Sequence, residues 1–244
     1  METNYNDFNN NSFSNIRKET VTDIRSFMSS VFSWMFLGLA ITSVVAWYFA
    51  FNPNMRGLLI TETGISGLGW IVTFAPFIFV LIMGLRFTKL SAQTLAIMFA
   101  VFAILMGMSM SFILLVYTSA SVFKTFAITS GMFGLMAVTG YTTKTDLTKF
   151  GSIMIMGLFG IILASVVNMF MHSAQIDYVI SIIGVLVFTG LTAYDVQKLK
   201  RIGGGVEYGA ENAKKLAIMG ALTLYLDFIN LFLFLLRFFG NRRN

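Results

Sequence analysis

Two aspartates stand inside long apolar stretches of the chain, where acidic residues are rare. No charged residue lies between positions 216 and 226 or between 228 and 236, on either side of Asp227, and Asp195 stands near the end of the preceding apolar stretch. An ionised aspartate at the centre of a membrane helix costs about 2.5 to 3.5 kcal/mol on insertion scales. Each carboxyl group must therefore be ion-paired, protonated or hydrated, which makes both of them candidates for proton or cation chemistry.

Helical spacing predicts where these two side chains lie. Residues three, four and seven apart share one face of a helix, and each aspartate belongs to such a face of small and polar residues. Only a short polar loop joins the two helices, so we expect these faces to pack together and the carboxyl groups to be neighbours. The faces comprise Gly220, Thr223, Asp227 and Asn230 in the last helix and Ser181, Gly184, Thr192 and Asp195 in the one before it.

Two carboxyl groups in contact cannot both ionise cheaply, so the pair titrates as a unit that can share one proton. Loss of that proton adds negative charge, which makes the groups repel each other or recruit a cation. The pair is therefore predicted to be a pH sensor and gate. Asp195 also has an alternative interpretation, because it lies three residues before Lys198 and could mark the end of its helix at the water interface.

A basic residue at the end of the second apolar stretch offers a counter-charge. Arg86 is a candidate latch that would hold one of the carboxylates when the gate is closed. The alternative is that Arg86, beside Lys89, only helps to orient its helix in the membrane.

The same polar faces offer oxygen atoms to a cation. Calcium takes six to eight oxygen ligands, and the available set is marginal, so a bound ion would keep several waters and bind loosely. Loose binding suits permeation better than storage. We therefore expect no resident cofactor and at most a transient calcium ion. The candidate ligands are the carboxylates of Asp195 and Asp227, with Asn230, Thr223 and Thr192 along a possible cation pathway.

Composition excludes most other chemistry. Of the 244 residues, 57% are hydrophobic and only 11% are charged, which indicates a membrane protein without room for a soluble catalytic domain. The chain has no cysteine and a single histidine, His172, so thiol catalysis, thiolate metal sites, zinc sites and histidine triads are excluded. The net charge of +6 falls in short loops beside apolar stretches, which is an orientation signal and not a nucleic-acid interface.

Seven apolar stretches are long enough to cross about 30 Å of hydrocarbon as helices. The sequence therefore predicts an all-α integral membrane protein in contact with the lipid bilayer, and the absence of period-2 alternation argues against a barrel. Residues 1–26 read as a retained polar tail and not a cleaved signal peptide, and residues 27–244 as the membrane domain. The predicted spans are 28–51, 65–85, 92–117, 122–142, 151–171, 178–197 and 216–239.

The basic residues are unevenly divided between the two ends of these spans. Twelve lie on the side of the N-terminus and five on the other, which favours a cytoplasmic N-terminus. The arginines near the C-terminus would also suit a last segment that re-enters the membrane, so that alternative stays open. The twelve are Arg17, Lys18, Arg25, Arg86, Lys89, Lys144, Lys149, Lys198, Lys200, Arg201, Lys214 and Lys215, and the five are Arg56, Lys124, Arg237, Arg242 and Arg243.

Four stretches of the chain resemble the Bax inhibitor-1 family, also called the transmembrane BAX inhibitor motif family. They are GYTTKTDLTKFG at 140–151, ASVVNMF at 164–170, GLTAYDVQKLK at 190–200 and LYLDFINLFLFLLRFFG at 224–240. The last two are specific, because they combine a YD at the end of one span with LDFINLF inside the next. The resemblance covers nearly the whole chain after the polar tail, and the signal-free, compact sequence is similar to a bacterial inner-membrane member.

This resemblance implies seven helices in which the last is central and the other six wrap around it. It also implies a pH-sensitive calcium leak, with Asp195 and Asp227 as the sensor and Arg86 as the latch. One departure is that some members carry an acidic residue within the second span, and none occurs here between Gly64 and Arg86. Permeation that depends on that residue is expected to be absent or different in this chain.

Two other classes of function compete with a pH-sensitive calcium leak, whose partners would be calcium ions and protons. The first is a binding module that regulates a membrane-anchored protease, with residues 1–26 as the handle for that partner. The second is an intramembrane aspartyl protease, which needs two carboxylates around one water. The presenilin-like family has a GxGD motif at its second aspartate, whereas this chain has TLYLD there, so we expect no catalytic residues and no enzyme.

Overall fold

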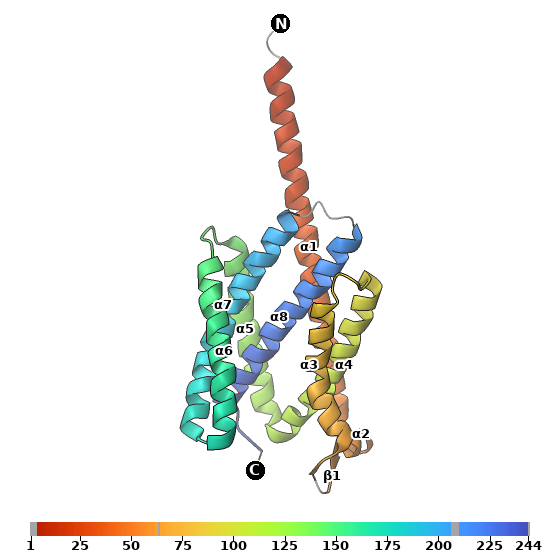
Figure 1. Ribbon diagram of the computed structural model, residues 1–244, viewed down its shortest axis with the longest axis vertical. Coiled ribbons are helices and arrows are strands. Elements are labelled where there is room, and N and C mark those ends of the chain that lie inside the picture. The colour runs from red at the N-terminus through yellow and green to blue at the C-terminus, as the bar shows by residue number, and fades with distance from the viewer. Residues whose placement is uncertain (1–3, 63, 206–209, 244) are drawn as a thin grey trace.

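The computed structural model describes residues 4–62, 64–205 and 210–243, with side chains for 23–62, 64–205 and 211–243. Most of the described chain is helical, apart from one short antiparallel hairpin (Figure 1). The side chains of the predicted tail up to residue 22, among them Arg17 and Lys18, lie outside the described set. The elements are α1 (Asn4–Phe51), α2 (Pro53–Leu59), β1 (Ile60–Thr61), β2 (Gly64–Ile65), α3 (Gly67–Leu85), α4 (Ala92–Val116), α5 (Ser119–Thr142), α6 (Thr148–Met171), α7 (Ala174–Gly204) and α8 (Ala210–Phe239).

Within the described residues, seven helical segments are long and apolar enough to cross a membrane, which confirms the predicted all-α fold with seven spans. Hydrocarbon offers no hydrogen bonds, so each crossing segment must satisfy its backbone internally, and the helix does this. The spans run over Asp23–Phe51 of α1, Gly67–Leu85, Ala92–Val116, Ser119–Thr142, Thr148–Met171, Ala174–Gly204 and Glu211–Phe239.

Polar residues between the apolar stretches start most of these helices. Each accepts a hydrogen bond from a backbone N–H of the first turn, which would otherwise be unsatisfied. Helix α6 ends at His172, whose left-handed φ of 53° stops the helix. The capping residues are Asn52 for α2, Ser66 for α3, Ser91 for α4, Thr118 for α5 and Ser173 for α7.

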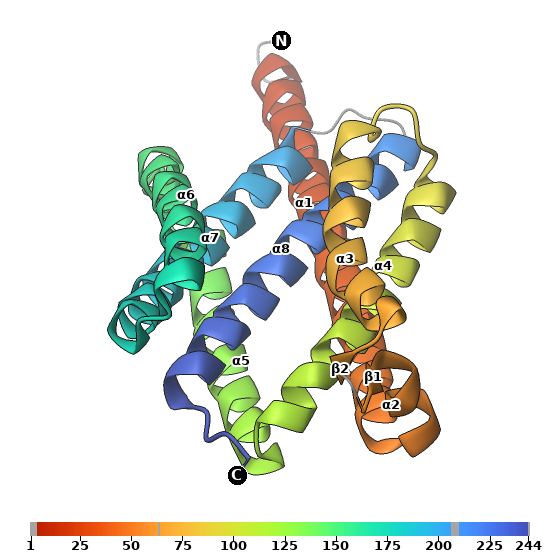
Figure 2. The same cartoon turned by 60° about the horizontal axis from the view of Figure 1, so that its bottom comes forward.

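Helix α8 is the most buried span. Of its most apolar stretch 67% is buried, against 50% for α7 and 28% or less for the other five. Helix α8 crosses the bundle obliquely and packs against α1, α4, α5 and α7, while α3 packs on α4 and α6 on α7 (Figure 2). The direct neighbours of α8 are thus chiefly four of the six other spans, and an arrangement with all six around it stays a prediction.

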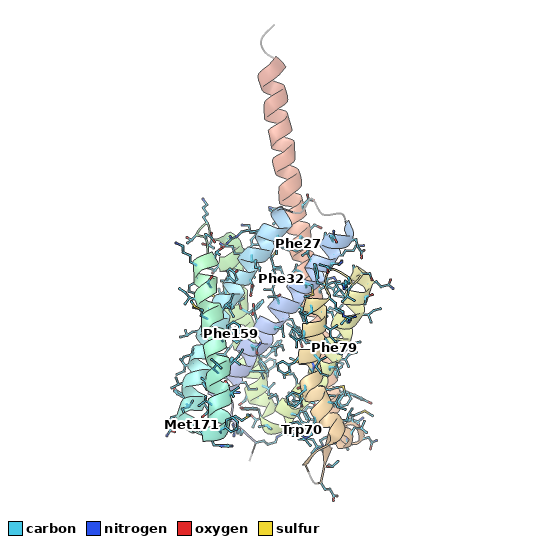
Figure 3. All side chains as sticks on the ribbon, viewed as in Figure 1. Phe27, Phe32, Trp70, Phe79, Phe159 and Met171 are labelled. Atoms are coloured by element: carbon cyan, nitrogen blue, oxygen red, sulfur yellow. The ribbon has the colours of Figure 1, made fainter. Side chains whose placement is uncertain are left out.

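The outer helices present large apolar side chains to their surroundings. Phe159 and Met171 on α6 and Trp70 on α3 are each more than half exposed, whereas Phe27 on α1 is buried against the other helices (Figure 3). In a soluble protein such surfaces would be covered by a partner. Here the lipid bilayer is the solvent that covers them.

The two termini lie at opposite ends of the bundle (Figure 1). The first part of α1 projects beyond the other helices at one end, which we call the N-face. At the other end, the C-face, the strand after α8 pairs with the α4–α5 connection: Thr118 N–H donates to Asn241 O over 3.1 Å and Arg243 N–H to Val116 O over 2.8 Å. Helix α8 therefore runs the length of the bundle and does not turn back. Which face is cytoplasmic stays a prediction.

Helices α5 and α7 are in close backbone contact at Gly140. A methyl group there would collide with the backbone carbonyl of Ala193. Small residues allow such backbone contact between membrane helices. Not every glycine does this, because a methyl group at Gly131 on the same helix would meet no atom within 4 Å.

These two glycines give a matched test of the α5–α7 contact. We expect Gly140→Ala to lower the stability of the folded protein by about 1 to 3 kcal/mol, because backbone atoms must move apart to admit the methyl group. Gly131→Ala should leave stability unchanged or slightly raise it, since alanine favours the helix. Thermal unfolding of the detergent-solubilised proteins measures both. Equal melting temperatures for the two variants would show that the contact at Gly140 is not tight.

Candidate functional site

The two aspartates are brought together by close packing of α7 against α8. A methyl group at Gly184 would collide with the ring of Phe234, and one at Gly220 with the side chain of Leu199. The rings of Phe188 and Phe234 stack beside this contact with centroids 5.7 Å apart. The predicted small and polar faces of the two helices thus do face each other.

The antiparallel stack of Phe188 on Phe234 places Asp195 opposite Asp227, because each aspartate lies seven residues from its phenylalanine. At the C-face Arg237 of α8 donates to Asp177 of α7 over 3.1 Å, which ties the end of one helix to the start of the other. Helix α7 continues to Gly204, so Asp195 lies about 14 Å along the helix from its end. The interpretation that Asp195 marks a helix end is therefore wrong. Two of the basic side chains that follow it find polar partners: Lys200 donates to Tyr141 O in the last turn of α5, and Arg201 donates to Asp146 in the α5–α6 connection.

The carboxyl groups of Asp195 and Asp227 lie within hydrogen-bonding contact of each other. Asp227 is only 5% exposed, and its Oδ2 atom is the one buried side-chain oxygen or nitrogen of the described residues without a hydrogen-bond partner. Asp195 is half-buried. A buried acceptor without a donor is costly, so this oxygen has a place for a proton, a water or a cation.

A cavity of about 590 Å³ opens beside this pair, between α3, α6, α7 and α8. Its walls are mostly apolar and include Phe77 of α3 and Phe234 of α8. The polar side chains that line it are Asp195, Asp227, Thr223, Asn230, Lys198, Tyr194 and Ser165.

Two of the three predicted pathway residues line the cavity. The Thr223 hydroxyl donates to Met219 O over 3.1 Å and the Asn230 amide to Leu226 O over 2.8 Å, which leaves the oxygen of each side chain able to accept a water or bind a cation. Thr192 does not line the cavity. It is fully buried, and its hydroxyl donates to Phe188 O within α7.

The cation nearest this pair is Lys198 and not Arg86. Lys198 lines the cavity and interacts electrostatically with Asp195. Arg86 caps the C-terminus of α3 and is exposed, and the ion pairs within the described residues are those of Arg201 and Arg237. The Arg86 latch thus stays a prediction. The spacing of one helical turn between Asp195 and Lys198 could have predicted that Lys198 lies near the pair. Ser165 could not have been predicted, because a serine among apolar residues gives no such signal.

The donor set does not resemble a resident metal centre. No group of three or more histidine, cysteine or acidic side chains occurs among residues 23–62, 64–205 and 211–243. Two carboxylates with the oxygens of Thr223 and Asn230 could coordinate only a hard cation that keeps part of its water shell.

On another side of α8, a buried hydrogen-bond chain fixes the helix. Tyr225, about 200° around the helix from Asp227, contacts the Thr42 hydroxyl of α1 over 2.7 Å, and Thr42 in turn donates to Ala103 O of α4 over 2.9 Å. The Thr42 proton is used on Ala103, so the Tyr225 hydroxyl is the donor to Thr42. Phe102 packs edge-on against the tyrosine ring with centroids 5.2 Å apart. Helix α8 thus has one side locked into α1 and α4 and another facing the cavity.

The fold and this site define a class: a multi-pass helical membrane protein with a carboxylate pair beside an intramembrane cavity. The family described as "Inhibitor of apoptosis-promoting Bax1" matches residues 24–244. The chain belongs to this Bax inhibitor-1 family, which confirms the resemblance found in its motifs.

Curated bacterial proteins are similar over almost their whole length. "Inner membrane protein YbhL" of Escherichia coli K12 is 46% identical over 221 residues, which cover 90% of this chain and 93% of that one. An uncharacterized protein of Borreliella burgdorferi is 41% identical, with 93% and 97% covered. The protein RP147 of Rickettsia prowazekii is 44% identical, with 91% and 92% covered.

The absence of cysteine from the chain allows a direct test of whether the cavity holds water. We expect a charged, membrane-impermeant methanethiosulfonate reagent to label Thr223→Cys on the order of tenfold faster than Thr192→Cys, because only an accessible, hydrated thiol forms the reactive thiolate. Phe159→Cys is the control for exposure to lipid and should label slowly. Labelling is measured by intact-protein mass spectrometry in liposomes. Equal rates at positions 223 and 159 would show that the cavity is filled by lipid and not by water.

Proposed function

We propose that this protein is a pH-sensitive leak channel or transporter for calcium in the bacterial inner membrane, with a cytoplasmic N-terminus. The observation that carries the proposal is the buried, incompletely hydrogen-bonded carboxyl group of Asp227 in contact with Asp195 beside a cavity of about 590 Å³. The name of the Escherichia coli relative supports the inner membrane as its location. The proposal gives the aspartates no catalytic role.

Proton sharing explains how the pair gates. With one proton between them, the two carboxyl groups hold each other and keep α7 against α8 at this level. When the proton leaves, two negative charges in contact repel each other or attract a cation. Either outcome changes the cavity wall, because the two carboxyl groups come from different helices.

Calcium suits the chemistry of this lining. Carboxylate, amide and hydroxyl oxygens are hard ligands of the kind that calcium prefers. Their small number leaves the ion weakly held, which permits release on the other side. In the proposal Arg86, at the end of α3 on the N-face, closes the path by binding one of the carboxylates when they are charged.

Calcium flux into dye-loaded proteoliposomes at pH 6, 7 and 8 tests the gate. We expect wild-type flux to vary with pH. Asp195→Asn and Asp227→Asn should each change the size of the flux and flatten its pH response, because an amide cannot share or lose the proton. Glu62→Gln is the matched control, since it removes an exposed carboxylate in the turn between β1 and β2.

Three results of this assay decide between the parts of the proposal. No flux at any pH from folded, oriented protein contradicts the channel. Flux that keeps its pH response in both aspartate variants contradicts the gate. If Arg86→Gln and the neighbouring Lys89→Gln give the same flux, the latch role of Arg86 is contradicted, while the gating role of the aspartate pair still stands.

A second candidate function rests on the projection of α1 beyond the bundle (Figure 1). Here residues 1–26 dock onto a membrane-anchored protease and change the rate at which it degrades membrane proteins. The prediction is that deletion of residues 2–22 abolishes this effect and leaves calcium flux unchanged. The half-life of a membrane-protein substrate in cells measures it. If the truncated chain still alters that half-life, the handle lies elsewhere.

A further inference from the structure

The N-face carries a second cavity that the aspartate site does not use. It has a volume of about 410 Å³ and lies between α1, the α5–α6 connection and α7. One of its walls comes from the stretch 140–151, which is one of the four motifs that carry the family resemblance. This motif has no part in the proposed calcium pathway. The lining residues that matter here are Lys144, Asp146, Lys200 and Arg201, with Ile24 from α1.

The walls of this N-face pocket are held in place by side chains of α7. Gln197 accepts from Leu147 N–H and donates to Thr145 O, each over 2.8 Å. One side-chain amide thus binds two backbone groups of the α5–α6 connection. Gln197 also accepts from Arg201 one turn later. Arg201 donates to Asp146 over 2.7 Å. The pocket is thus a built feature and not a gap under a loose loop.

The charge of the pocket is positive. The hydroxyl and the backbone N–H of Thr148, together with Arg201, lower the pKa of Asp146 to about 2, so this carboxylate stays ionised and pairs with Arg201. Among the side chains of residues 23–62, 64–205 and 211–243, no carboxylate forms an ion pair with either lysine of the pocket. Lys200 donates to Tyr141 O over 2.6 Å, which uses one of the three N–H donors of its ammonium group, and Lys144 is exposed.

The position of the pocket indicates which kind of ligand would neutralise its positive charge. The apolar spans of α5 and α6 end and begin at Thr142 and Thr148, so we expect the pocket at the boundary between hydrocarbon and water. Basic pockets between membrane helices at this level suit the phosphate of an anionic lipid headgroup. Ile24 adds an apolar wall on which the start of the lipid chain can lie.

We propose that the N-face pocket is a binding site for a phosphate group, contacted by Lys144 and Lys200 and supplied by an anionic phospholipid. Arg201 and Gln197 position the α5–α6 connection and do not bind the ligand themselves. Free phosphate has the same chemistry as the headgroup, so the test separates the two sources.

The experiment is native mass spectrometry of the full-length protein in detergent, titrated with phosphatidylglycerol and, separately, with zwitterionic phosphatidylcholine. We expect phosphatidylglycerol to bind more tightly. Loss of one cation near a membrane surface weakens such binding about fivefold, so Lys144→Gln and Lys200→Gln should each cost about that factor and the double variant about 25-fold. Lys200→Arg keeps the charge and should retain binding.

Lys149→Gln is the matched control, because it removes an exposed lysine that does not line the pocket. An equal loss in this variant, or no preference for phosphatidylglycerol, overturns the proposal. Lys144→Gln alone decides the question if Lys200→Gln fails to fold, because Lys144 is on the surface. Excess inorganic phosphate that leaves the lipid bound supports a lipid headgroup as the source. Phosphate that displaces the lipid and is itself retained by the protein supports the site and overturns the lipid as its source.

Discussion

The close contact of α7 with α8 determines where both intramembrane carboxyl groups lie. Glycines at positions 184 and 220 let the two helices approach, and the Asp177–Arg237 ion pair holds their register at the C-face. An aspartate alone in hydrocarbon would be expensive. Its cost falls when a second carboxyl group can share its proton and a polar part of a cavity lies beside it. The position of Asp227 in the most buried helix is therefore tolerable only because α7 presents Asp195 at the same level.

The surroundings of α8 are asymmetric, and this bears on how a gate could move. On one side the Tyr225–Thr42–Ala103 chain binds α8 to α1 and α4 with buried hydrogen bonds. On another side α3 and α6 complete the cavity largely through apolar side chains. Breaking the first set would leave buried polar groups unpaired, whereas apolar side chains can slide past one another at lower cost. Movement of the cavity wall is thus expected first from α3 and α6 relative to a fixed α8.

Hydropathy and helical periodicity are local properties, so the seven spans and the facing polar stripes could be predicted from the sequence. The end of α7 could not, because Lys198, Lys200 and Arg201 look like a membrane boundary until the contact of Lys200 with α5 and that of Arg201 with the α5–α6 connection are known. Thr192 belongs to the predicted stripe of α7, but it lies part of a turn around the helix from Asp195. It is therefore buried outside the cavity. Ser165 and Phe77 enter the cavity from helices whose neighbours no spacing rule identifies. The assignment of calcium depends on the family resemblance more than on these residues.

Helix α7 links the aspartate pair to the N-face pocket. Asp195 faces the cavity, while Gln197 and Arg201, within two turns of it, hold the α5–α6 connection on another face of the same helix. At the same face of the bundle, Glu211 of α8 accepts from the first N–H of α4 over 2.7 Å. Because α7 is a rigid helix, it cannot shift at Asp195 without shifting at Gln197 and Arg201 as well. A ligand at the N-face could therefore change the balance of the aspartate pair only if it binds one position of α7 better than another, since differential affinity is what shifts such an equilibrium.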